Sequence, residues 1–197
     1  MLYRIAHILR DRFPFIWELI GWINSLLFGL RYKNKLIVIS QITKLYEKDG
    51  FHINSLTQEN ATLLAKMFAE QPKESFDYFK PHEFNVKTLR KLATDKSFLA
   101  YIVCNDEGRP VGYFFMRSFF WGKCFRGYFT DYRWRRRGIN KQMNLCATAI
   151  ATKLGLRSFG TIAPDNIASL KSAESANQVK VIETLDNGDY FVEYLPK

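Results

Sequence analysis

Cysteine and histidine are scarce in this chain of 197 residues, which contains three of each. They are Cys104, Cys124, Cys146, His7, His52 and His82. The cysteines are an odd number without paired metal-ligand spacing, and the histidines lie far apart. This pattern favours small buried thiols in a reducing compartment over a disulfide framework. We therefore expect no metal site.

Several catalytic and nucleotide-binding motifs are also missing. The sequence has no GxGxxG, no Walker loop and no Ser or Cys nucleophile elbow. These absences argue against a Rossmann dinucleotide site, a P-loop and a hydrolase of the nucleophile-elbow type.

Acidic residues are few, because 19 Asp and Glu face 29 Lys and Arg, which gives a formal charge of +10. This balance favours anionic partners: a nucleotide-like cofactor, nucleic acid or an acidic membrane surface. Charge alone does not choose among them. With 47% hydrophobic residues, the chain is long enough for one well-filled core and short for two, so we expect one domain with an extension.

The most informative stretch runs from Tyr128 to Gly155. β-Formers predict a strand over Phe125–Tyr132. Apolar residues then recur at spacings of three and four, which predicts a helix from Ile139 to Leu154 with Gly155 as a stop signal. A turn that contains three consecutive arginines, Arg135–Arg137, joins the two elements.

Such a junction is suited to bind a phosphate or pyrophosphate. The first turn of a helix leaves backbone N–H groups without intrahelical partners, and the helix dipole adds positive potential there. Gly138 lets the backbone approach a ligand closely, and the neighbouring arginines can add charge-assisted contacts. The alternative is a solvated basic turn, or one that contacts nucleic acid phosphate; the position at a helix start favours the pyrophosphate.

The pattern Arg135-x-x-Gly138-x-Asn140 between strand and helix resembles the acyl-CoA pyrophosphate loop of the GNAT superfamily of N-acyltransferases. The family pattern ends in Gly or Ala, and Asn140 departs from it. After the helix come a strand over Ser158–Pro164 and an Asn166-x-x-Ser169 helix start, which is similar to the family's next helix. Two last strands, Val179–Leu185 and Asp189–Leu195, complete the ending.

The resemblance covers roughly the last three quarters of the chain and implies an α/β (α+β) fold. The expected core is a mixed, mostly antiparallel sheet with helices on both faces, opened between its fourth and fifth strands. Residues 35–197 would form this GNAT-like domain and residues 1–34 a basic helical extension.

The implied reaction moves an acetyl group from acetyl-CoA, as co-substrate, to a primary amine. The cofactor strand would lie along the pantetheine arm and the loop would hold the pyrophosphate. The implied cofactor-binding residues are Phe129, Thr130, Arg135, Arg136, Arg137, Gly138, Ile139, Asn140 and Asn166.

Proton transfer needs a base for the amine and an acid for the thiolate. His82 and Asp131 are the candidate bases, although Asp131 is equally a candidate structural partner for the neighbouring arginines. Many members have a tyrosine acid seven residues after the Asn that starts the later helix, where this chain has Ala173. That leaves Ser169, water or no dedicated acid.

The segment around His82 has the compact pattern Phe79-x-Pro81-His82-x-Phe84. It is similar to one in superfamily members that act on amino sugars of surface polysaccharides, so a nucleotide-linked amino sugar is the expected acceptor. A structural histidine bonded to backbone is the commoner case for such a loop. Two other functions stay open: a GNAT-fold acyl-CoA-binding module without turnover, and a basic peripheral membrane or nucleic-acid-binding protein.

The N-terminal run from Phe13 to Leu30 is apolar and aromatic, but Pro14, Glu18 and Asn24 interrupt it, so it is a poor transmembrane span. Basic residues flank it at Arg4, Arg10, Arg12, Arg31, Lys33 and Lys35. We expect helices that pack on the domain or on a second copy in a homodimer; the alternative is a helix in a membrane interface. The expected location is the cytoplasm. If the helix lies in a membrane interface, the expected location is the inner face of the membrane.

Between the extension and the motif region, β-branched runs on both sides of Asp49-Gly50 predict a hairpin over residues 36–56. Thr57 is the expected N-cap of a helix that ends near Glu70, with Leu63, Leu64, Met67 and Phe68 on its apolar face. Strands of a meander follow, with turns at Asn105–Gly108 and Trp121–Lys123.

Overall fold

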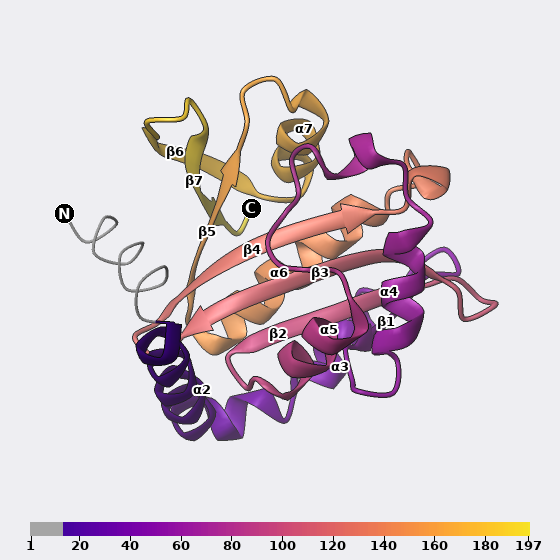
Figure 1. Cartoon of the computed structure of the whole chain (residues 1–197). Coiled ribbons are helices and arrows are strands. Elements are labelled where there is room, and N and C mark those ends of the chain that lie inside the picture. The colour runs from indigo at the N-terminus through magenta and orange to yellow at the C-terminus, as the bar shows by residue number, and fades with distance from the viewer. Residues whose placement is uncertain (1–13) are drawn as a thin grey trace.

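The computed structural model describes residues 14–197. Residues 1–13, with the predicted basic positions Arg4, Arg10 and Arg12, lie outside the described part. The sheet has the strand order β1-β2-β3-β4-β5-β7-β6 (Figure 1). Every neighbouring pair is antiparallel except β4 and β5, which are parallel. The predicted mixed, mostly antiparallel sheet is therefore confirmed.

The strands alternate apolar side chains between two faces, as a period of two requires. The strand bounds are β1 His52–Ser55, β2 Phe98–Cys104, β3 Pro110–Phe119, β4 Lys123–Thr130, β5 Arg157–Ile162, β6 Gln178–Thr184 and β7 Tyr190–Leu195. On β3, Phe114 and Met116 enter one core, whereas Tyr113 and Phe115 enter the other. A sheet with two buried faces needs helices on both, and both faces are covered.

The helices form the two outer layers. Their bounds are α2 Pro14–Leu36, α3 Ile39–Leu45, α4 Ala61–Ala69, α5 Val86–Thr94, α6 Ile139–Leu154 and α7 Ile167–Ala176, with short 3-10 turns η1 Lys73–Phe76 and η2 Tyr132–Trp134. Helices α2, α3 and α6 share one core, and α4 and α5 share the core on the opposite face. Figure 1 shows α6 behind the sheet and α4 and α5 in front of it. Helix α7 packs on α6 and on the β5–β7 end.

One predicted element is wrong. The first arm of the expected hairpin is helix α3, preceded by the end of α2, and β1 pairs with β2 instead. The Asp49-Gly50 turn is present, since both residues have positive φ and Lys48 bridges Phe51. The β-branched residues of this stretch are spaced so that Ile39 and Ile42 reach the α6 core from one helix face, and this packing overrides their strand propensity.

Helix α2 crosses the boundary expected at residue 34 and is anchored on the domain. Phe28 and Tyr32 are buried in the same core as α6. Asn24 donates to the Ser118 carbonyl at 3.0 Å and accepts from the Phe120 N–H at 3.1 Å. None of the helices in the described part of the chain is long and apolar enough to cross a membrane.

Candidate functional site: a strand opening beside a helix N-terminus

The arginine-rich loop joins β4 to α6 with two residues in the left-handed region. Arg136 has φ 64° and Gly138, at the N-cap of α6, has φ 79°. A Cβ added at Gly138 would meet no atom within 4 Å, so the space in front of the helix N-terminus is open. Ile139 is buried beneath it and anchors the first turn of α6 in the core. The backbone N–H groups of this turn therefore face an accessible space.

Arg137 and Arg135 of the loop contact different neighbours. The Arg137 guanidinium stacks on the Trp134 ring with its carbon 4.5 Å from the ring centroid. Arg135 donates to the Ser75 hydroxyl at 3.1 Å, which ties the loop to η1. All three arginine side chains are exposed, so they raise the positive potential at the helix N-terminus without being neutralised by a buried acid.

The sheet opens beside this loop. Strands β4 and β5 pair at Lys123–Arg157, Cys124–Ser158 and Phe125–Phe159, and no pairing between them continues past Phe125 in the described part of the chain. The stretch from Arg126 to Thr130 keeps its partner β3 on one edge and has no strand on the other. An unpaired strand edge has free N–H and C=O groups that a ligand can pair.

Orphaned polar atoms lie along the same stretch of β4. The Tyr128 hydroxyl, the Thr130 hydroxyl and two nitrogens of Arg126, Nε and Nη2, are buried without a hydrogen-bond partner. The Arg126 side chain is only 6% exposed, and its guanidinium carbon lies 4.0 Å from the centre of the Tyr194 ring. Buried polar groups are normally satisfied, so these donors indicate a missing partner.

A chain of polar side chains connects Arg126 to the loop. The Arg126 Nη1 donates to the Thr148 hydroxyl at 2.8 Å, and Thr148 donates to Asn177. Asn177 donates to the Asn144 side-chain oxygen at 3.2 Å, and Asn144 donates to the Asn140 side-chain oxygen at 2.7 Å. The loop and the orphaned donors thus belong to one structural unit formed by α6, α7 and β4.

His82 lies on the opposite face of the sheet, in the segment between η1 and α5. Its Nδ1 lies 2.9 Å from the Glu83 carbonyl oxygen, which can only accept, so Nδ1 carries the proton. Nε2 therefore accepts from the Tyr113 hydroxyl at 3.0 Å. Burial lowers the pKa of His82. The imidazole is neutral at pH 7 and its basic nitrogen points to Tyr113.

The segment that carries His82 crosses the front of β3 and β4 and reaches α7 (Figure 1). The Tyr78 hydroxyl donates to Asp165 at 2.9 Å, immediately before α7. Phe79 packs its ring against Phe84, Phe115 and Phe129. This segment covers the face of the sheet opposite α6.

The overall fold agrees with solved structures of acetyltransferases. The GNAT domain of S. lividans PAT superposes with a TM-score of 0.63 at 13% identity, covering 72% of this chain and 88% of that domain. The ribosomal-protein-S5-alanine acetyltransferase from Vibrio fischeri gives 0.62 at 12% identity, covering 76% and 94%. The PaiA N-acetyltransferase from Thermoplasma acidophilum, solved with coenzyme A, gives 0.61 at 14% identity, covering 75% and 99%.

The chain has the GNAT fold. No protein-family model matches the sequence, and the comparison with curated proteins finds no match. Identities of this size show the fold alone. Within this GNAT fold, the opening between β4 and β5 occurs where the family resemblance implies it, and Gly138 lies at the start of α6 as the sequence pattern predicts.

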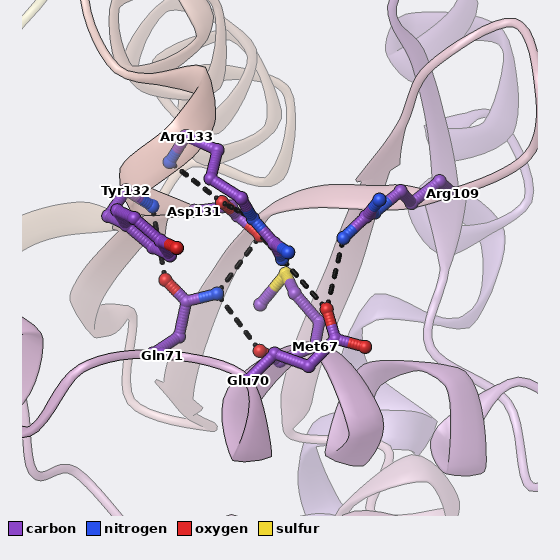
Figure 2. Close-up of polar contacts among 7 residues, drawn as sticks. All are labelled: Met67, Glu70, Gln71, Arg109, Asp131, Tyr132 and Arg133. Atoms are coloured by element: carbon purple, nitrogen blue, oxygen red, sulfur yellow. Dashed lines mark hydrogen bonds and ion pairs between the residues drawn. The ribbon is translucent and has the colours of Figure 1, made fainter.

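Asp131 lies at the start of the loop between β4 and α6 and is fully buried. Figure 2 shows the polar contacts around it. Its carboxylate accepts four hydrogen bonds, three from the backbone N–H, Nε and Nη2 of Arg133 and one from the Gln71 side chain. Burial opposes ionisation, but these hydrogen bonds outweigh it and hold the pKa below its ordinary value. These four hydrogen bonds use the lone pairs of the carboxylate, so none is free to take a proton from a reactant. This favours Asp131 as a structural partner of the neighbouring arginine over Asp131 as a base.

The network around Asp131 fixes the loop to two other elements. Gln71, after α4, accepts from the Tyr132 N–H at 3.0 Å and donates to the Met67 carbonyl at 2.9 Å. Glu70 accepts from Arg133 at 2.8 Å and from Arg109 at 3.0 Å (Figure 2). Asp131 is thus a positioning residue that holds the entry of the loop against α4.

Replacing Asp131 by Asn should destabilise the protein by about 2 kcal/mol, because a buried ion pair loses its charge while Arg133 keeps its partner Glu70. The Asp131 contribution is complete above the ordinary Asp pKa of about 3.9 and is lost as pH falls through the lowered native pKa. Urea denaturation at pH 7 and at pH 3 measures both effects. An unchanged midpoint at pH 7 would contradict this role.

Ser169 and Asn166 lie at the start of α7. The Asn166 side chain accepts from the Ser169 N–H at 3.1 Å and caps the helix. Ser169 is half-buried, and Ala173, at the position of the expected tyrosine acid, is buried one turn further. The predicted roles of Asn166 toward the cofactor and of Ser169 as an acid stay predictions. In the described part of the chain, no group of three or more His, Cys, Asp or Glu is placed to hold a metal.

Asn140, which departs from the family pattern, accepts from the Ser172 hydroxyl at 2.9 Å as well as from Asn144. We expect Asn140→Gly to bind acetyl-CoA as tightly or more tightly, since the loop backbone becomes more accessible. The loss of the α6–α7 bond should lower the free energy of unfolding by about 1 kcal/mol.

The matched control is Ser172→Ala, which removes the same hydrogen bond between helices but leaves Asn140 in place. Calorimetric titration with acetyl-CoA compares the two variants with the parent. A collapse of binding in Asn140→Gly alone would show that the Asn140 side chain itself contacts the ligand.

Sequence reasoning missed Arg126 and the helix α5. A single arginine inside an aromatic strand gives no signal of burial. Helix α5 had a signal, since the Asn85 side chain accepts from the Thr88 N–H at 2.8 Å as a standard N-cap, and Leu89 is buried.

Proposed function

We propose that this chain transfers an acetyl group from acetyl-CoA to the primary amine of a small molecule. The observation that carries the proposal is the left-handed, open Gly138 at the N-terminus of α6, beside an unpaired edge of β4. A helix N-terminus binds phosphate through its free N–H groups, and an open strand edge can pair an extended amide-containing arm. Both features are next to each other and suit the two halves of coenzyme A.

The residues present fit this donor. The backbone N–H groups from Arg136 to Asn140 would hold the pyrophosphate, with Arg135 and Arg137 adding positive charge. The backbone of Phe129 and Thr130 would pair the pantetheine arm. Acetyl-CoA supplies the activated thioester; the chain supplies binding, orientation and proton removal.

Arg126 offers a test of this fit that does not depend on turnover. Arg126→Met should weaken acetyl-CoA binding about tenfold, because the open donors Nε and Nη2 would no longer bond to the ligand. The same change should leave the unliganded protein as stable or more stable, since it removes a buried charge without an acidic partner.

The control for Arg126→Met is Arg157→Met, which removes one positive charge at the paired end of β4 and β5, from a side chain that is exposed and paired with Glu193. Calorimetry and urea denaturation measure affinity and stability. Equal losses of affinity in both variants would show that the effect comes from long-range electrostatics and not from hydrogen bonds of Arg126 to the ligand.

Proton removal from the amine is assigned to His82. Because Nδ1 donates to the Glu83 carbonyl, Nε2 is the basic nitrogen, and it accepts from the hydroxyl of Tyr113, which is buried in the core. The half-buried His82 would take the amine proton on Nε2 when the amine replaces the Tyr113 hydroxyl as its hydrogen-bond partner. Asp131 remains the second candidate base of the pair, disfavoured by its four hydrogen bonds.

The acceptor we propose is a nucleotide-linked amino sugar. The aromatic rings of Phe79 and Phe84 lie beside His82, and aromatic faces suit the apolar side of a sugar ring. The net charge of +10 favours an acceptor that carries phosphate. The support for this acceptor class is the residue pattern of the His82 segment and these contacts.

A binding module without turnover is the second candidate, favoured by Ala173 at the position of the acid and by the engaged nitrogens of His82. The deciding experiment measures free thiol release from acetyl-CoA over a panel of amines that includes nucleotide-linked amino sugars, simple amino sugars, polyamines and peptides. Turnover with an amino sugar supports the proposal. Binding of acetyl-CoA without turnover on any amine would favour the module, and turnover confined to peptides would overturn the small-molecule acceptor.

A further inference from the structure

Helix α2 has a second apolar face whose side chains are exposed in the described structure. Six large side chains recur at helical spacing along it: Phe15, Leu19, Trp22, Ile23, Leu26 and Leu30. Phe15 is 75% exposed, Trp22 64% and Leu30 66%. Residues at these spacings lie on one side of an α-helix, so they form one continuous stripe, here called the α2 stripe. A stripe of this size on a protein surface marks an interaction site.

The polar residues that interrupt this run in the sequence do not lie on the α2 stripe. Asn24 is buried and hydrogen-bonds the backbone of Ser118 and Phe120. Glu18 pairs with Lys91 of α5 at 2.7 Å. Both polar groups are used to fix α2 on the domain, which leaves the opposite side of the helix apolar over its first four turns. The interruptions therefore give no reason to exclude a lipid partner.

The charge around α2 identifies the kind of partner. From Phe15 to Tyr46 the sequence has one acidic residue, Glu18, against four basic residues, Arg31, Lys33, Lys35 and Lys44. Arg31 and Lys35 donate to the Phe120 and Leu154 carbonyls of the domain, and the exposed Lys33 continues the spacing of the α2 stripe. The whole chain carries +10. A second copy on the α2 stripe would bring like charges together, whereas anionic phospholipid headgroups attract them. Aromatic and aliphatic bulk with basic residues at one end is the composition of a helix that lies in a membrane interface.

We infer that the α2 stripe docks the protein on an anionic phospholipid membrane, with the helix lying along the surface. Phe28 and Tyr32 hold the other side of α2 in the core, so the whole domain would follow the helix. Helix α2 lies beside the end of β3, whereas the loop before α6 lies at the opposite end of the sheet (Figure 1). Docking would therefore leave the helix N-terminus at Gly138 open to its ligand. This inference does not rest on the proposed function.

The test is co-sedimentation of the full chain with vesicles of phosphatidylcholine alone and of phosphatidylcholine with about one third phosphatidylglycerol. The parent should bind the anionic vesicles at least tenfold more strongly, and binding should fall at least tenfold between about 0.1 M and about 0.5 M salt. The double variant Leu19→Gln with Leu26→Gln should lose at least tenfold in binding, since two stripe residues no longer enter the lipid.

The control variant is Leu45→Gln with Leu63→Gln, which removes two leucines that are more exposed than Leu19 and Leu26, from α3 and α4, and should bind like the parent. Absence of sedimentation with anionic vesicles overturns the inference, and so does binding that the Leu19 and Leu26 changes leave intact. Analytical ultracentrifugation covers the alternative: a dimer that this double variant converts to monomer, without vesicle binding by the parent, would assign the α2 stripe to a second copy.

Discussion

Gly138→Val should weaken acetyl-CoA binding by about 30-fold, which corresponds to about 2 kcal/mol. Gly138 has φ 79°, a region in which a β-branched residue is strained by about 1 to 3 kcal/mol. The valine variant can relieve this strain by moving the loop backbone, which turns the N–H groups of the first α6 turn away from the pyrophosphate. The open space in front of Gly138 means that no neighbouring side chain has to move, so the effect arises from the backbone and from the ligand.

Gly188→Val is the matched control for this substitution. Gly188 has φ 88°, its added Cβ also meets no atom within 4 Å, and it lies in the turn between β6 and β7. The two variants therefore carry similar backbone strain and should lose similar stability. Calorimetric titration should show parent-like affinity for Gly188→Val. An unchanged dissociation constant of acetyl-CoA for folded Gly138→Val would show that this loop does not bind the cofactor.

His82→Ala should lower kcat with a good amine acceptor by about 100-fold, the lower end of the range for a general base. Because burial lowers the pKa of His82, the parent's rate should fall only as pH drops through this lowered value, below the ordinary histidine pKa of about 6.5. The base is active when neutral, so the rate rises with pH through this limb. The alanine variant should lose this pH-dependent limb. Tyr113→Phe should lower the rate but keep the limb, because His82 is still present.

His52→Ala is the control for the loss of an imidazole. His52 is exposed and pairs with Glu47 and Asp106, away from the segment that carries His82, and its pKa is raised. Its rate and pH profile should match those of the parent. If His82→Ala and Asp131→Ala both keep the parent's rate and profile, proton removal belongs to water or to another residue.

The elements near the motif could be predicted closely from the sequence because local signals agree there. The apolar spacing of α6, the glycines at both of its ends and the basic turn before it all indicate the same boundaries, and the observed helix has them. The opening between β4 and β5 was also predictable, although only from resemblance. A strand's partner depends on distant residues, which no local period encodes.

Other parts depend on tertiary packing and could not be predicted in this way. The β-branched stretch Ile39–Leu45 has strand propensity, yet packing of Ile39 and Ile42 against the core of α6 favours a helix there. The burial of Arg126 and the hydrogen bond from Gln71 to Asp131 depend on β4, α4, α6 and β7, which meet only in the folded chain. The sequence left the role of the apolar run in α2 open, because Glu18 and Asn24 interrupt it and only the folded chain shows that both lie off the exposed stripe.

The central claim is that the opening beside Gly138 binds acetyl-CoA, and a crystal structure of the chain soaked with acetyl-CoA tests it most directly. The account predicts the pyrophosphate against the N–H groups from Arg136 to Asn140 and the pantetheine arm along Phe129 and Thr130, with Arg126 donating to the ligand. Acetyl-CoA bound at another surface, or an opening between β4 and β5 that stays closed to it, would contradict the account.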